Sequence, residues 1–154
     1  MHDALVTLHV LGAVLLGGTV LVDTLTGILM PRVTTVGELR GLTRLSKVNQ
    51  YLGVAAAALV ALFGYWTAGD ADIGLDITWL LVAQIVFWVS MAVAVIVLTR
   101  AALSLASKVE RLPDGPLPAD VSTELNKPLY PVLGTLLAAA YVFVVYLMVA
   151  KPNW

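Results

Sequence analysis

The sequence predicts an all-α membrane protein in which a single integral membrane domain, residues 1–154, forms a four-transmembrane-helix up-down-up-down bundle. First, 60% of the 154 residues are hydrophobic, 12% are charged and the mean hydropathy is +0.92, more apolar surface than a soluble core of this size buries. Second, four apolar stretches are each long enough for the roughly 20 residues that a helix needs to cross the hydrocarbon. Third, none of them alternates polar and apolar residues, as strands would.

The helices are predicted over about residues 4–30, 51–68, 79–99 and 129–150. Pro31 ends the first, and Gly69 with Asp70 ends the second. The third is expected to continue to about residue 112, because residues 101–111 contain no helix breaker. The short loops imply that neighbouring helices are antiparallel.

Two segments between these helices have sequence patterns of their own. Residues 39–50 place apolar side chains at helical spacing with basic side chains on another side, which predicts an interfacial amphipathic segment leading into the second span. Residues 113–127 begin with three prolines within six residues and are followed by Pro128, and they are expected to form a loop of little fixed structure.

The orientation follows from the basic residues. Eight of the nine lysines and arginines lie between the first and second helices or between the third and fourth, and only Lys151 lies elsewhere. The positive-inside rule therefore places both termini on the non-cytoplasmic side (N-out/C-out).

We expect a multi-pass protein of the bacterial inner (cytoplasmic) membrane. Its expected partners are membrane lipids and other membrane subunits or a homo-oligomer, and nucleic acid is not one of them.

Two polar residues of the first helix share one face. His9 and Asp23 are 14 residues apart, which brings them within roughly 40° of each other around a helix. For Asp23 the favoured interpretation is a structural polar network at the inner ends of the helices, with Arg44, Lys47 and Arg100. A proton relay would need a second site partway across the membrane, and none is found.

His9 is the best candidate site. It is predicted to lie level with Gln84, Tyr146 and Met148, where the first two could support the imidazole by hydrogen bonding and Met148 could be a further ligand. A neutral imidazole hydrogen-bonded to Gln84 or a tyrosine and a haem ligand are both compatible with its position. The chain has no cysteine, and no metal other than a haem iron at His9 is predicted, so the cofactor stays open with haem b as a possibility.

Several short stretches resemble a known family: Leu8-His9-Val10-Leu11-Gly12, Gly17-Gly18, Met30-Pro31-Arg32, Phe63-Gly64-Tyr65-Trp66 and Met148-Val149-Ala150-Lys151-Pro152. They are similar to small bacterial predicted integral membrane proteins of unknown function, which in turn resemble the CopD and HemJ-type membrane proteins. The resemblance implies a role in haem or metal binding for His9 alone.

Two functions remain. The shortage of intramembrane polar residues favours a non-catalytic accessory or structural subunit of a larger respiratory or photosynthetic membrane complex. The alternative is a small haem b-binding redox protein for electron transport, with His9 as axial ligand. An enzyme is less favoured, because no catalytic loop motif is present, and a transporter would show broken helices and inverted repeats. An apolar slot beside His9 would favour the haem protein.

Overall fold

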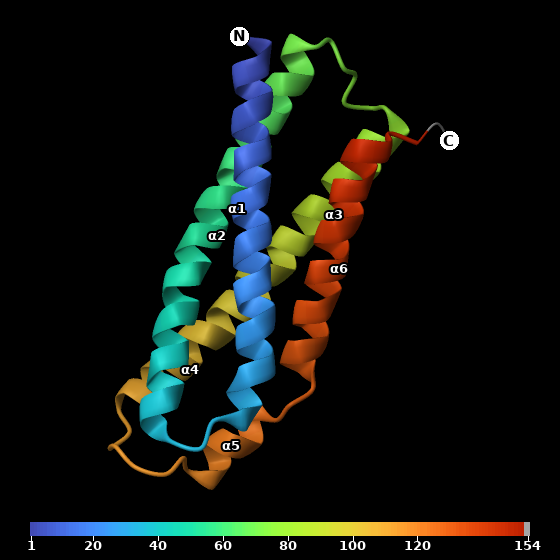
Figure 1. Cartoon of the computed structure of the whole chain (residues 1–154). Helices are drawn as coiled ribbons and strands as arrows, with labels where there is room; N and C mark the ends of the chain where they lie inside the picture. Colours follow the sequence, from blue (N-terminus) through green and yellow to red (C-terminus); the bar gives the residue numbers. More distant parts are fainter. Residues whose placement is uncertain (153–154) are drawn as a thin grey trace.

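The structure, a computed structural model, describes residues 1–152 and is helical, with no β-strand in that range. Its elements, labelled in Figure 1, are α1 (His2–Leu29), the 3-10 turn η1 (Met30–Arg32), α2 (Val36–Asp70), α3 (Thr78–Val93), the π-helical η2 (Ala94–Thr99), α4 (Arg100–Glu110), α5 (Ala119–Leu125) and α6 (Leu129–Ala150). Within the described range, four helical stretches are long and apolar enough to cross a membrane. The predicted fold class is confirmed.

The four stretches form an antiparallel bundle. α1 packs against α2 and α6, while α3 packs against α6 and α4 packs against α2, so the rod of α3, η2 and α4 crosses behind α1 (Figure 1). The start of α1 and the end of α6 lie at one end, the terminal end, near the loop that joins α2 to α3 (Figure 1). The opposite end, which holds η1 and α5, is the basic end. The side of the membrane that each end faces stays a prediction from the charges.

α2 is one uninterrupted helix from Val36. The Thr35 side chain accepts a hydrogen bond from the Glu38 N–H at 3.3 Å, and the Glu38 carboxylate accepts one from the Thr35 N–H at 3.3 Å. This capping box starts the helix, and nothing breaks it before Ala71. Residues 39–50 are therefore part of α2 and run without a break into the second span, and their place at the membrane interface stays a prediction.

The third stretch carries an irregularity. Between α3 and α4 the six residues of η2 form a π-helical turn, which is wider than an α-turn and re-aims the side chains that follow it. At its last residue the Thr99 hydroxyl donates to the Gln50 side-chain oxygen of α2 at 2.7 Å. η2 thus turns a polar side chain toward α2.

Residues 113–127 are ordered, contrary to the expectation of a loop. α5 buries Val121 and Leu125 against Val36, Leu39 and Val109, which together form the compact core of the basic end. The Val36 N–H also donates to the Gly115 carbonyl at 3.0 Å. Proline limits the length of helix here, but burying these apolar side chains outweighs the cost of ordering the segment.

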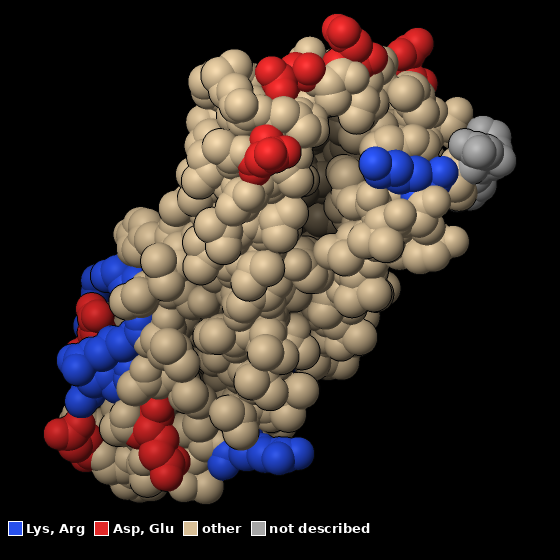
Figure 2. Space-filling view, turned by 45° about the horizontal axis from the view of Figure 1, so that its top comes forward, with Lys and Arg blue, Asp and Glu red and all other residues tan. Residues whose placement is uncertain are grey.

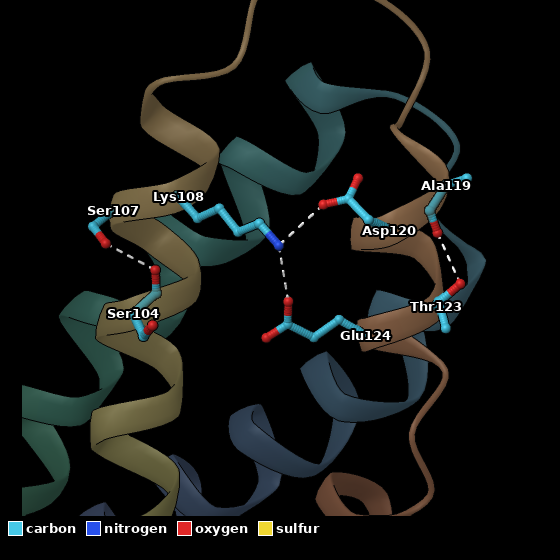
Figure 3. Close-up of polar contacts among 7 residues, drawn as sticks. All are labelled: Ser104, Ser107, Lys108, Ala119, Asp120, Thr123 and Glu124. Carbon is cyan, nitrogen blue, oxygen red and sulfur yellow. Dashed lines mark hydrogen bonds and ion pairs between the residues drawn. The ribbon is translucent and has the colours of Figure 1, made fainter.

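An exposed ion-pair cluster also connects α4 to α5 (Figure 3). The Lys108 ammonium lies 3.3 Å from the Asp120 carboxylate and 3.1 Å from that of Glu124. Because exposed pairs of this kind contribute only about 0–1 kcal/mol, the buried valine and leucine of α5 contribute more to its docking.

The surface between the two ends is apolar. Figure 2 shows Asp and Glu at both ends of the molecule and most of Lys and Arg at the end opposite the uppermost acidic groups, with a broad uncharged band between them. Within the most apolar window of each stretch only 6–17% of the residues are buried inside the chain. The protein is therefore a membrane-spanning bundle whose helices expose most of their apolar side chains to lipid or to other molecules.

Candidate functional site

His9 is held against the middle of α2. Its Nδ1 lies 2.9 Å from the Val60 carbonyl oxygen, and because a carbonyl only accepts, Nδ1 carries the proton and donates. In a neutral imidazole the lone pair is then on Nε2. Gly64 makes this position possible, since a Cβ there would lie 2.9 Å from His9 Cε1 and 3.0 Å from Nδ1.

Two cavities flank His9. The first, of about 370 Å³, is lined along α1 from His9 to Asp23 and is called the Asp23 cavity. The second, of about 400 Å³, is lined by residues from His9 to Lys151 at the terminal end and is called the Lys151 cavity. His9, Phe87 and Met148 line both, and the surface is visibly hollowed near the terminal end (Figure 2). An apolar slot therefore lies on each side of the imidazole.

Lys151 turns back at the end of α6. Its backbone is left-handed, with φ 42° and ψ 56°, and its N–H donates to the Leu147 carbonyl at 3.0 Å, an αL arrangement that ends a helix. The ammonium lies 5.9 Å from the centre of the Trp79 ring, within the range of a cation–π contact. This lysine and Trp79 both line the Lys151 cavity.

Of the side chains expected around His9, Met148 lines both cavities with it, but Tyr146 lines neither and is 56% exposed. Tyr146 is two residues from Met148, about 200° around the helix, and therefore points away. Tyr141 lines the Asp23 cavity instead and donates to the Ala13 carbonyl at 2.7 Å. Its spacing of seven residues from Met148 was the signal that places both on one face of α6.

Gln84 lines the Lys151 cavity, but its hydrogen bonds go elsewhere. Its side-chain oxygen accepts from the Tyr65 hydroxyl at 3.1 Å, and its side-chain nitrogen donates to the Leu75 carbonyl at 3.2 Å. The Trp88 indole in turn donates to the Tyr65 oxygen at 3.0 Å. Gln84 joins α3 to α2 and to the following loop rather than orienting His9.

Asp23 closes the far end of its cavity. Its carboxylate accepts from the Asn49 amide at 2.7 Å and from the Gln50 amide at 3.4 Å. Asn49 also donates to the Thr19 carbonyl at 2.9 Å, and the Gln50 oxygen accepts from Thr99. The polar network at Asp23 is thus built from amides and a hydroxyl.

The expected basic members of that network lie elsewhere. Arg44, Lys47 and Arg100 are exposed, and no ion pair within residues 1–152 joins them to Asp23. Lys47 and Arg44 are two and five residues from Asn49, which turns them about 200° and 140° away from it around α2. Because Lys47 and Arg44 point away from Asp23 around α2, the carboxylate is held by amide hydrogen bonds instead of the predicted ion pairs.

A metal at His9 would need ligands from outside the chain. Within residues 1–152 no three histidine, aspartate or glutamate side chains come together in a way that could hold a metal ion. A macrocycle that brings its own four nitrogens needs only one or two axial side chains. His9 and Met148 are residue types that serve as such ligands, and both line the two cavities.

Comparison with known proteins identifies the family. Residues 3–152 match the family described as "Predicted integral membrane protein (DUF2269)", so the chain belongs to this family. No curated protein and no solved structure matches the chain. The wider likeness to the CopD and HemJ-type proteins stays a prediction from short motifs.

Proposed function

We propose that this member of the DUF2269 family binds haem b inside its bundle, with His9 as an axial ligand, and acts as a small membrane redox protein. The observation that carries the proposal is the placement of His9: Nδ1 is fixed on the Val60 carbonyl and the ring lies between two apolar cavities. Histidines that ligate metals typically donate their other ring N–H to a carbonyl or carboxylate in this way.

The residues around His9 fit such a group. The Lys151 cavity of about 400 Å³ is within the roughly 300–1,000 Å³ of cofactor and small-molecule sites. Phe87 and Val144 give it apolar walls, and Met148 offers a thioether on the same wall. Lys151 offers a cation to a carboxylate substituent. A bound haem would supply one-electron chemistry, and these side chains would hold it, orient it and exclude water.

The first experiment is an absorption spectrum of the protein purified in mild detergent after expression with a haem supply, oxidised and then reduced with dithionite. We expect a Soret band and reducible α and β bands that His9→Ala abolishes. The matched control is His2→Ala, because His2 is the other histidine and is 3.0 Å from Asp70 at the terminal end. A colourless wild type, or a His9→Ala protein with the same bands, would overturn the proposal.

A second variant tests the position of the imidazole without removing it. In Gly64→Ala the new Cβ would lie 2.9 Å from His9 Cε1, so the ring has to shift, and we expect a weaker or altered Soret band. Gly18→Ala is the control, because nothing lies within 4 Å of a Cβ built there. Identical haem content in the two variants would contradict the role of the α2 contact.

A second candidate function is that of a non-catalytic accessory subunit in a larger respiratory or photosynthetic complex of the bacterial inner membrane. The observation that favours it is the low burial of the four apolar stretches, 6–17% in their most apolar windows. A neighbouring subunit would cover part of this surface. Membranes solubilised mildly would then contain the tagged chain in a large assembly of fixed stoichiometry, whereas a chain that migrates alone would exclude this function.

A further inference from the structure

The Asp23 carboxylate has an unusual environment for a group at membrane depth. Its hydrogen-bond donors are the neutral amides of Asn49 and Gln50. Within residues 1–152 no lysine, arginine or histidine forms an ion pair with it. Asp23 is six residues before the end of α1, so its depth corresponds to about 9 Å of helix.

An ionised carboxylate in such a place is costly unless a positive charge or a proton compensates it. The amide donors stabilise the negative charge by hydrogen bonding, but they do not neutralise it. Within residues 1–152 the nearby basic side chains, Arg44, Lys47 and Arg100, are exposed and do not supply that charge. The compensating charge must come from a proton or from a ligand.

The cavity beside Asp23 decides what kind of ligand fits. It has a volume of about 370 Å³, and its walls between the two ends are mostly apolar, as Leu16, Val20 and Leu98 illustrate, with Ser90 and Tyr141 as polar exceptions. Polar side chains gather at the Asp23 end, where Thr99 is turned inward by the π-helical η2. The cavity combines an apolar body with one anionic end.

We infer that the Asp23 cavity binds a lipophilic organic cation, whose apolar groups occupy the space between α1, η2 and α6 and whose positive charge lies against the Asp23 carboxylate. A neutral amphiphile would fill the apolar part but leave a proton as the means of neutralising the carboxylate, whereas a cation does both. The charged end of this site is separate from the proposed haem ligand, because Asp23 is 14 residues of α1 from His9, about 21 Å, although His9 lines the opposite end of the same cavity.

The test uses the full-length protein in detergent and measures binding of tetraphenylphosphonium by equilibrium dialysis, beside triphenylphosphine oxide as an uncharged analogue. We expect saturable binding of the cation that is at least tenfold weaker in Asp23→Asn. Asp72→Asn is the matched control, because it removes a carboxylate from the terminal-end loop at a residue with φ 50°, a conformation that asparagine accepts.

A steric variant tests the same site without touching its charge. Gly134 lines the cavity from α6, and nothing lies within 4 Å of a Cβ built there. Gly134→Leu keeps Asp23 and its amide donors while filling the cavity, so it should also weaken binding at least tenfold with unchanged helix content by circular dichroism. Absent binding by the wild type, equal binding of the uncharged analogue, or full binding by Gly134→Leu would each overturn the inference.

Discussion

Replacing Gly17 with alanine tests the contact between α1 and the Tyr141 side chain of α6, which lines the Asp23 cavity. A Cβ at Gly17 would lie 2.5 Å from the Tyr141 hydroxyl oxygen and 2.8 Å from Cζ, so the tyrosine must move. Its hydroxyl now donates to the Ala13 carbonyl at 2.7 Å. The substitution therefore both overpacks the contact and breaks a hydrogen bond inside the bundle.

The size of the effect follows from three contributions. Overpacking costs about 1–3 kcal/mol, and loss of a hydrogen bond between membrane helices costs about 0.6 kcal/mol. The better helix propensity of alanine offsets about 0.8–1 kcal/mol of this. We expect Gly17→Ala to lower the free energy of unfolding by about 2 kcal/mol net.

The assay is reversible unfolding of the detergent-solubilised protein by increasing mole fraction of dodecyl sulfate, followed by circular dichroism. Gly18→Ala is the control, because the adjacent residue has open space at its Cβ position and its stability should be unchanged or slightly raised. Introduced into Tyr141→Ala, the Gly17→Ala substitution should cost less stability than it does in the wild type, because the side chain that it crowds is gone. Equal stabilities of the Gly17 and Gly18 variants would refute the reasoning.

Three further predictions address topology, α5 and the Lys151 cavity. Because the chain has no cysteine, single Asp72→Cys and Ser107→Cys variants can report the orientation. An impermeant maleimide should label the cysteine at position 72 in intact cells, but the cysteine at position 107 only after permeabilisation. The reverse pattern would contradict the charge-based topology. In α5, Val121→Ala should lower the stability of the segment by on the order of 1–3 kcal/mol, whereas Lys108→Met should change that stability by less than about 1 kcal/mol. Hydrogen exchange of residues 119–125 measures both effects. A larger effect of the lysine substitution would contradict the account in which buried apolar side chains dock α5. In the Lys151 cavity, Lys151→Gln should release haem to apomyoglobin several-fold faster than wild type, and unchanged release would exclude a role for this cation.

Much of the architecture could be predicted from the sequence because it depends on sums over local stretches. Hydropathy summed over about 20 residues identifies a span whatever its neighbours are, and Pro31 or Gly69 ends a helix for reasons of local backbone geometry. The helical pattern of residues 39–50 was equally visible. The structure adds that the Thr35 cap starts one long helix that includes these residues, and their place at the membrane interface stays a prediction.

Side-chain partners depend on the rotational phase of each helix, which the sequence alone left open. Tyr146 and Tyr141 are both tyrosines of α6, yet only Tyr141 faces α1. Asp23 could reach basic or amide side chains at the same depth, and the way α2 packs on α1 presents Asn49 to it.

By itself, then, the sequence determined that this is a four-helix membrane protein, that its basic residues gather at one end, and that His9 and Asp23 share a face of α1. Only the tertiary structure decided that His9 donates to Val60, that α5 is ordered, and that two cavities meet at the imidazole. The reason is physical: hydropathy and helical spacing are properties of one segment, whereas cavities and hydrogen-bond partners arise from how separate segments pack.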